Sequence, residues 1–121
     1  MNKGITLHSI PEPSSPPQFV RAVNKTIDSI GVMWNEVPTR DQNGVIVNYT
    51  VSYHSVTATP GYLIEEKLII ASSRFATLTN LTGNTNYSIT VMASNRIGNG
   101  PPSSPISVNT SDGSKIFFLN R

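Results

Sequence analysis

The sequence predicts an all-β fold, a seven-stranded antiparallel β-sandwich. Short runs of alternating apolar and polar residues recur along the chain, and turn residues separate them at spacings of about 8–15 residues. No segment has the apolar period of a helix. Residues 81–87 (Leu-Thr-Gly-Asn-Thr-Asn-Tyr) also have the sequence form of a tyrosine corner. In such a corner, the hydroxyl of a tyrosine at the start of a strand bonds the backbone a few residues upstream.

The amino-terminal half of the chain contains three predicted strands. Residues 19–23 form the first, and residues 45–56 form the third after a turn-forming stretch at 38–44. In the second and third strands every other residue is apolar, and alternate side chains of a strand point to the same face. The residues expected to face inward are Ile30, Val32 and Trp34 in the second strand and Val47, Tyr49, Val51 and Tyr53 in the third.

Four further strands are predicted in the carboxyl-terminal half. Residues 63–71 form the fourth, of mixed exposure, after a turn at 57–61. The sixth begins at Tyr87 behind the corner, and a loop at 95–102 leads from it into the seventh. The residues expected to face inward on the last three strands are Ala76 and Leu78, then Tyr87, Ile89, Val91 and Ala93, and finally Ile106 and Val108.

These alternations predict a core built around the single tryptophan. Trp34 is expected between the sheets against Tyr49, Tyr87 and Val91, and the Tyr87 hydroxyl is expected to be buried and hydrogen-bonded. A platform of aromatic rings that stacks a ligand is the alternative, although the inward parity alone accounts for these residues. The predicted structural core comprises Trp34, Tyr49, Val51, Leu81, Tyr87 and Val91.

Length and charge limit the classes of function. A chain of 121 residues suits one domain that folds without a metal ion or a disulfide. The formal net charge is +2 and the nine Lys and Arg residues are scattered, so no basic face for nucleic acid is expected. No apolar stretch is long enough for direct membrane insertion, and residues 1–10 lack the apolar middle of a signal peptide.

Patterns of catalytic or metal-binding residues are also missing from the sequence. There is no cysteine, which excludes thiol chemistry, zinc–thiolate sites and disulfides. The two histidines, His8 and His54, belong to no nucleophile–base arrangement. Glu65 and Glu66 are adjacent, so on a strand their side chains point to opposite faces and cannot act together. We therefore expect no enzymatic activity, no cofactor and no metal.

Several of these features together resemble one known family. The tyrosine corner, Trp34 in the second run, the Tyr49-x-Val51-x-Tyr53 pattern, and Gly98 and Gly100 ahead of a Pro/Ser cluster at 101–105 look like a fibronectin type III domain. The resemblance covers roughly residues 16–111, most of the chain. It implies an immunoglobulin-like sandwich without a catalytic site. The lack of cysteines and the place of the tryptophan in the second run favour this type over a true immunoglobulin domain.

The resemblance also implies boundaries within the chain. The fibronectin type III domain is assigned to residues 16–112, and residues 113–121 form a C-terminal extension that fits no part of the module. Residues 1–15 are assigned to a linker, because their prolines cannot donate to a strand ladder. The alternation within residues 4–10 also leaves open that they are the last strand of a preceding module.

The loop after the sixth strand is the first choice for contact with a partner. The resemblance implies that an Arg-Gly-Asp tripeptide in this loop would bind integrins, and that tripeptide is absent here. Arg96, Ile97 and Asn99 are the candidate binding residues, because loops on a rigid scaffold often bind partners. A loop shaped by glycine and proline alone, without a partner, is the alternative.

Five asparagines stand in Asn-x-Ser/Thr acceptor sequences for N-glycosylation, although chance alone would give roughly three in such a composition. The five candidates are Asn24, Asn48, Asn80, Asn86 and Asn109. Three of them, Asn48, Asn86 and Asn109, alternate with residues expected to face inward, so a glycan on each would point to solvent. Occupied acceptors would place the chain in the secretory pathway as a glycoprotein.

The sequence and the resemblance predict a non-catalytic module for adhesion, recognition or spacing. It is expected in an extracellular protein or the ectodomain of a membrane protein, with proteins and neighbouring modules as partners. The isolated domain is expected to be monomeric. Three alternatives stay open: an ectodomain repeat of a receptor tyrosine phosphatase or kinase, a linker module of a secreted carbohydrate-active enzyme, and a module of a cytoplasmic, muscle-type array. The fold alone does not separate them.

Overall fold

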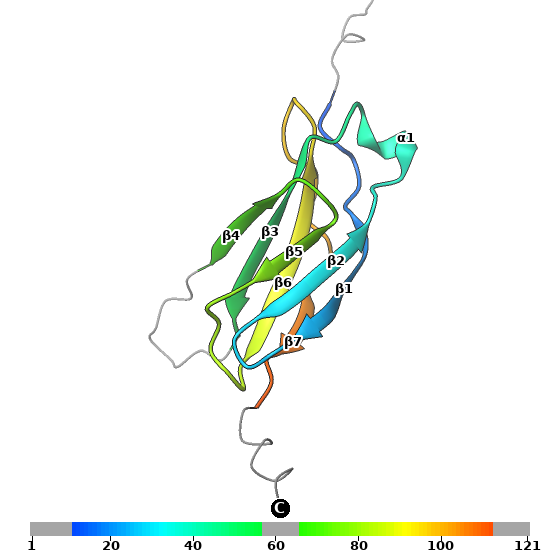
Figure 1. Cartoon of the computed structure of the whole chain (residues 1–121). Helices are drawn as coiled ribbons and strands as arrows, with labels where there is room; N and C mark the ends of the chain where they lie inside the picture. Colours follow the sequence, from blue (N-terminus) through cyan, green and yellow to red (C-terminus); the bar gives the residue numbers. More distant parts are fainter. Residues whose placement is uncertain (1–10, 57–65, 113–121) are drawn as a thin grey trace, which may run out of the picture.

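The structure is a computed structural model that describes residues 11–56 and 66–112. These residues form seven strands in two antiparallel sheets, which confirms the predicted β-sandwich (Figure 1). One sheet has three strands in the order β1–β2–β5, and the other has four in the order β4–β3–β6–β7. The strands are β1 (Gln18–Lys25), β2 (Ile30–Asn35), β3 (Asn48–Ser55), β4 (Lys67–Ala71), β5 (Phe75–Leu78), β6 (Asn86–Ser94) and β7 (Ile106–Asn109).

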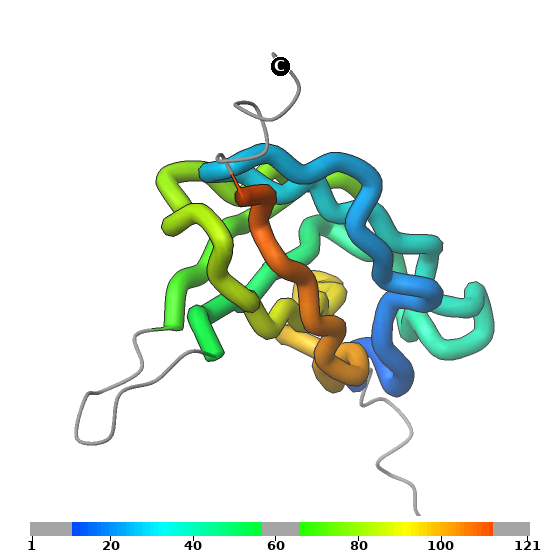
Figure 2. The backbone as a smooth tube through the Cα atoms, turned by 90° about the horizontal axis from the view of Figure 1, so that it is seen from below, coloured from blue at the N-terminus to red at the C-terminus, as the bar shows by residue number. Residues whose placement is uncertain are grey.

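The two sheets pack face to face, and the described chain enters and leaves the domain at opposite ends. Figure 2, which looks from below, shows the strands arranged around the space that the core side chains fill. The longest pairing joins β3 to β6, in register from Asn48 opposite Ser94 to Ser55 opposite Tyr87. The described residues begin beside α1 and end beyond β7, at the other end of the sandwich (Figure 1).

The stretch at 38–44, predicted as a turn, contains a short helix. This helix, α1 (Thr39–Gln42), has four residues and ends at Asn43, whose backbone is left-handed (φ 55°). Gly44 follows with φ 126°, a conformation that glycine adopts without steric cost. One helical turn is too short to show an apolar period, so the sequence pattern does not distinguish it from a turn.

The bounds of two strands differ from the prediction. β3 begins at Asn48, and Val47 before it is 52% exposed, so the expectation that Val47 faces inward is wrong. The backbone N–H of Val47 donates to the carbonyl of Ser94, which is already the register partner of Asn48, so the regular ladder and its alternation end there. β4 begins at Lys67; the predicted residues 63–65 and the turn at 57–61 lie outside the described residues.

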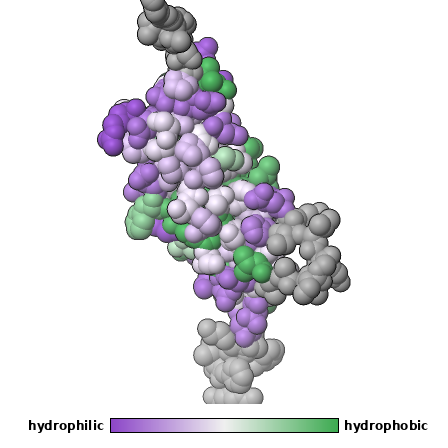
Figure 3. All heavy atoms as spheres, turned by 180° about the vertical axis from the view of Figure 1, so that it is seen from behind, coloured by the Kyte–Doolittle hydropathy of each residue, from purple (hydrophilic) through white to green (hydrophobic). Residues whose placement is uncertain are grey.

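The outer face of the four-stranded sheet is built largely of small polar residues. Thr50 and Ser52 of β3 and Ser88 and Thr90 of β6 alternate with inward neighbours, and Ser52 lies directly opposite Thr90. The space-filling view from behind shows weakly polar residues over the middle of the molecule, with apolar residues in separate places (Figure 3). The exposed apolar residues Leu68 and Ile70 of this face lie on its edge strand β4.

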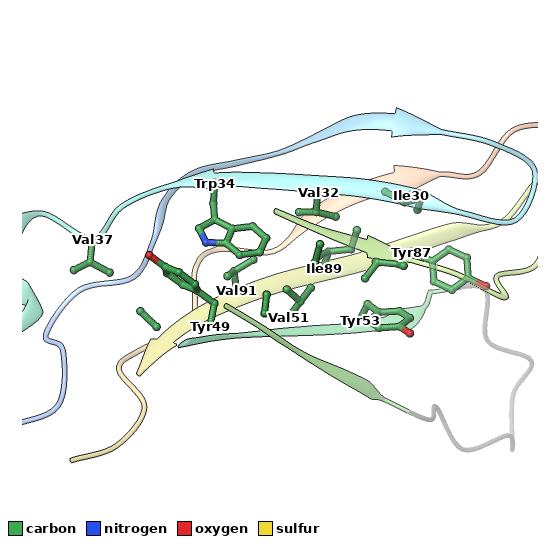
Figure 4. Packing of buried hydrophobic residues seen from close by; sticks show 14 residues of the cluster. Ile30, Val32, Trp34, Val37, Tyr49, Val51, Tyr53, Tyr87, Ile89 and Val91 are labelled. Carbon is green, nitrogen blue, oxygen red and sulfur yellow. The ribbon is translucent and has the colours of Figure 1, made fainter. Parts of the chain in front are cut away.

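Fourteen buried apolar residues form one core between the sheets (Figure 4). Trp34 is 1% exposed and meets Tyr49 edge to face, with ring centroids 5.4 Å apart and an interplanar angle of 64°. Tyr87 lies at the other end of the core, beside Ile30 and Tyr53, so it does not contact Trp34 as the sequence suggested (Figure 4). The members are Ile30, Val32, Trp34, Val37, Tyr49, Val51, Tyr53, Ala71, Ala76, Leu78, Tyr87, Ile89, Val91 and Ala93, with Leu81 partly buried against them.

The tyrosine corner has the expected hydrogen bond. The backbone N–H of Thr82 donates to the Tyr87 hydroxyl at 2.9 Å. The Thr110 hydroxyl extends the network, because it donates to the Thr82 carbonyl at 2.7 Å and accepts from the Thr85 N–H at 3.0 Å. Thr110 is 3% exposed, so β7 and the corner are joined by buried polar contacts.

Gly83 in this corner has a steric role that the sequence did not suggest. A Cβ atom at position 83 would lie 2.7 Å from Cγ1 of Ile27 and 3.2 Å from its carbonyl oxygen. Glycine thus permits a close approach of the β1–β2 turn to the corner, and any larger residue requires Ile27 to move.

Candidate functional site

The loop end of the domain is organised by one buried asparagine. Asn95 follows β6 directly and is 3% exposed. Its Nδ2 group lies within hydrogen-bond distance of three carbonyls, those of Pro11 at 3.0 Å, Gln42 at 3.1 Å and Asn43 at 3.0 Å, which share its two hydrogens. Its Oδ1 atom accepts from the backbone N–H of Ile97 at 2.9 Å and of Gly98 at 3.2 Å. Three segments far apart in sequence therefore meet at this side chain.

The three candidate contact residues of the loop differ in their availability. Arg96 is exposed and Ile97 is 53% exposed, so both side chains are open to a partner. Asn99 is exposed as a residue, but its Oδ1 atom accepts a hydrogen bond from the Ser94 hydroxyl, and the two residues form an isolated β-bridge. Of these three candidates, Arg96 and Ile97 are therefore the side chains more open to a new contact.

A second exposed apolar site lies on the edge strand β4. Leu68 and Ile70 are each 63% exposed on the outer face, opposite Ser52 and Thr50 of β3. The Val56 N–H donates to the Asn86 carbonyl of β6. In the β3–β6 register, the backbone N–H and C=O groups of even-numbered β3 residues therefore point toward β6, and those of odd-numbered residues point toward β4. The register then places the backbone groups of Leu68 and Ile70 on the free edge.

Three of the five glycosylation candidates share the outer face of the four-stranded sheet. Asn86 and Asn109 are directly opposite each other on β6 and β7, and Asn48 lies at the far end of the same face. The amide of Asn86 also donates to the Ser107 hydroxyl at 3.3 Å. Asn24 is exposed on β1, and Asn80 is exposed with a left-handed backbone (φ 58°) before the corner. All five side chains have at least part of their surface at solvent.

A hollow of about 400 Å³ lies beside the aromatic pair of the core and is lined by Trp34, Tyr49, Arg21 and Arg74 among others. The Nε1 atom of Trp34 is buried and has no hydrogen-bond partner among the described residues. Because the rings of Trp34 and Tyr49 belong to residues only 1% and 6% exposed, they offer no surface for stacking a ligand. The aromatic platform considered from the sequence is therefore not formed.

Two buried tyrosines, Tyr49 and Tyr53, are expected to lower the stability of the domain at alkaline pH. Burial, and next the charge of Glu36, raise the pKa of Tyr49 above its usual 10.0, with Arg74 acting in the opposite direction. Burial, and next Tyr87, raise the pKa of Tyr53. At a pH below the pKa of tyrosine in the unfolded chain, both hydroxyls are protonated in the folded and the unfolded chain. Above that pH the unfolded chain loses these protons first, so the free energy of unfolding falls.

We expect the free energy of unfolding to be unaffected by these groups at about pH 8 and to fall as the pH rises above about 10. Urea unfolding at a series of alkaline pH values measures this slope. The double variant Tyr49→Phe, Tyr53→Phe is the control, since it removes both titrating groups and leaves the remaining side chains in place. A slope as steep in the double variant as in the unchanged protein would assign the effect to other groups.

No group of three or more His, Asp or Glu side chains that could hold a metal ion exists within residues 11–56 and 66–112. In the same part of the chain, no helix is long and apolar enough to cross a membrane. His54 is half-buried on β3, and the carboxylate of Glu66 accepts a hydrogen bond from the Ser52 hydroxyl at 2.5 Å.

Sequence reasoning missed the role of Asn95 and of Gly100. The polar residue directly after a long apolar alternation is the signal that could have pointed to Asn95, because Asn side chains commonly bond backbone groups at the ends of strands. The sequence places Gly100 in the loop after the sixth strand without a particular role. A Cβ at this position would lie 2.7 Å from the Pro13 carbonyl oxygen, so the glycine instead allows two segments to touch.

The comparisons with known proteins agree with this architecture. Receptor-type tyrosine-protein phosphatase F of Danio rerio is 32% identical over 118 residues, covering 93% of this chain and 6% of that protein. Cell adhesion molecule DSCAML1 of Gallus gallus is 37% identical over 100 residues, covering 81% of this chain and 5% of that protein. The chain therefore spans only a small fraction of the length of the relatives it matches.

A solved structure and a family model complete the comparison. The solution structure of the third fibronectin III domain of the human KIAA0343 protein has a TM-score of 0.80 at 24% identity, with 93% of each chain covered, and shows the same fold. The family model of the fibronectin type III domain matches residues 15–109 of this sequence, and these residues contain all seven strands and the tyrosine corner. The chain belongs to the fibronectin type III family.

Proposed function

We propose that this domain is a non-catalytic module for adhesion, recognition or spacing in a larger extracellular or membrane-anchored protein. One observation carries the proposal: the described chain enters and leaves a two-layer sandwich at opposite ends, which suits modules joined in series (Figure 1). The relatives support it, because one is called a cell adhesion molecule and this chain corresponds to 5% of its length.

An ectodomain repeat of a receptor tyrosine phosphatase is the second candidate. It is favoured by the match to receptor-type tyrosine-protein phosphatase F, which extends over 93% of this chain. In that setting the domain itself would still bind or space, because a fibronectin type III domain is a non-catalytic module. The two candidates differ in what the rest of the protein does and agree on the role of this module.

The exposed sites indicate the kind of partner that a recognition role would involve. Ile97 and Arg96 combine an apolar and a cationic side chain on one loop, and Leu68 and Ile70 add an apolar pair on the edge strand β4. Each site consists of two side chains, whereas a stable protein interface buries about 800 Å² per partner and involves about 20–30 residues. We therefore propose a monomeric isolated domain whose protein contacts gain strength from neighbouring modules.

The extracellular part of the proposal is tested by glycosylation. We expect the chain, secreted from animal cells behind an added signal peptide, to lose mass when N-glycans are removed enzymatically. Asn48, Asn86 and Asn109 are the favoured sites, since they share an outer face free of packing contacts with the other sheet.

The matched control carries Asn→Gln at all five acceptors and should show no change in mass. Single substitutions then assign the occupied positions by mass spectrometry. A secreted, folded chain without any glycan would remove the main support for an extracellular location.

A further inference from the structure

We infer that residues 11–15 are part of a rigid joint that fixes the direction in which the chain enters the domain. This inference rests on the proposed function, in which another module precedes this one. It also goes beyond the sequence interpretation, which placed these residues in a linker. The joint is formed by three segments: residues 11–15, residues 41–43 at and after α1, and the loop 95–100, all at one end of the sandwich (Figure 1).

Two asparagine side chains hold the first residues of the joint. The Nδ2 group of Asn95 donates to the carbonyl of Pro11 at 3.0 Å, and that of Asn43 donates to the carbonyl of Glu12 at 2.8 Å. Asn95 is itself fixed, because it is buried and its Oδ1 atom accepts two backbone hydrogen bonds within its own loop. The carbonyls of consecutive residues are thus bonded by two different segments.

Asp41 holds the next two residues. The backbone N–H of Ser14 donates to the Asp41 carbonyl at 2.8 Å, and the Ser15 hydroxyl donates to Oδ2 of the same residue at 3.0 Å. Asp41 lies within α1, whose left-handed end at Asn43 turns the chain toward Asn95. The segment is therefore bonded at four of its five positions, 11, 12, 14 and 15, and position 13 between them is held by packing.

Close packing against Gly100 completes the joint. Pro13 is buried, and a Cβ atom at position 100 would lie 2.7 Å from its carbonyl oxygen and 2.8 Å from its Cβ. Gly100 is held in place by its N–H, which donates to the Ala93 carbonyl of β6 at 2.8 Å. Prolines at 11, 13, 16 and 17 also restrict the backbone of the segment. Together these features leave the segment little freedom to change direction.

The inference can be tested because the chain has no cysteine, so spin labels can be placed at chosen positions. One label is introduced by Glu12→Cys and the other by Thr77→Cys on β5; both residues are exposed. Pulsed electron paramagnetic resonance then gives the distribution of distances between the labels. We expect a single narrow distribution, similar in width to that of a reference pair on two strands, Thr77→Cys with Ser107→Cys.

Two variants should release the joint. Asn95→Ala removes the bond to Pro11, and Gly100→Ala introduces the clash with Pro13; in each we expect the distribution from position 12 to become at least about twice as broad. Arg96→Ala is the matched control in the same loop, because its exposed side chain has no role in the joint, and it should leave the width unchanged.

The reference pair separates release of the joint from unfolding, since it stays narrow only if the sandwich remains folded. A broad distribution in the unchanged protein, or a narrow one in both variants with the reference pair also narrow, would overturn the inference. These outcomes are independent of the glycosylation test. A glycosylated domain with a flexible joint would refute this inference alone, and a rigid joint without glycans would refute only the extracellular location.

Discussion

Replacing Trp34 with alanine is expected to destabilise the domain by about 3–5 kcal/mol, the cost of removing a large aromatic side chain from a packed core. Trp34 is 1% exposed and makes the edge-to-face contact with Tyr49, so the substitution leaves a cavity next to a second aromatic ring. Urea unfolding followed by far-ultraviolet circular dichroism measures the loss. Fluorescence is unsuitable for this variant, because Trp34 is the single tryptophan of the chain.

Two controls separate the volume of the indole from its other properties. Trp34→Phe keeps an aromatic ring and removes an N–H that has no partner among the described residues, so its cost should be clearly smaller than that of alanine. Met33→Ala changes the neighbouring residue, which is half-buried on the opposite face of β2, and should cost at most about 1 kcal/mol. Equal losses for Trp34→Ala and Met33→Ala would contradict the central position of Trp34 in the core.

Replacing Tyr87 with phenylalanine is expected to cost about 1–3 kcal/mol, although it removes a single oxygen atom. The Tyr87 hydroxyl accepts the N–H of Thr82, and without it that donor loses its partner in a partly buried corner. The same corner is bonded to β7 through Thr110, so the loss should also weaken the attachment of the last strand. Chemical unfolding gives the change in free energy, and amide hydrogen exchange at Thr82 shows whether the donor has become accessible.

Tyr53→Phe provides the control for this experiment. Tyr53 and Tyr87 are almost equally buried, at 6% and 7% exposure, and they lie at the same end of the core (Figure 4). The Tyr53 hydroxyl has no hydrogen bond to the described residues, so its removal should cost less than about 1 kcal/mol. If the two variants lost the same stability, the corner hydrogen bond would contribute nothing measurable.

Features with a short period or a local motif could be predicted from the sequence. Ile30, Val32 and Trp34 face inward because side chains of a strand alternate, and this alternation is visible without any knowledge of the partner strands. The tyrosine corner was predictable for the same reason, since its hydrogen bond joins residues only five positions apart. Val47 shows the limit of predictions from alternation. It continues the apolar alternation of β3 in the sequence, but the regular pairing of β3 with β6 has already ended at this residue.

The joint at the loop end could not be predicted, because it depends on contacts between distant segments. Asn95 bonds Pro11 across 84 positions and Gln42 across 53, and no local pattern indicates which backbone carbonyls will reach its amide. The role of Gly100 could not be predicted either, because the lack of a side chain at this position matters only through its contact with the distant residue Pro13. The sequence therefore predicted the position of the loop between β6 and β7, but not the hydrogen bonds of this loop within the domain. Its role as a binding loop stays a prediction.

The joint also decides how the domain would respond to mechanical tension between its two ends. A pull on the amino-terminal side acts first on the hydrogen bonds of residues 11–15 with Asn95, Asn43 and Asp41, before any force reaches β1. Detaching this segment would lengthen the molecule by at most about 3.3–3.6 Å for each released residue and leave both sheets intact. The domain would thus yield in a small reversible step, and the Trp34 core would open only at a higher force.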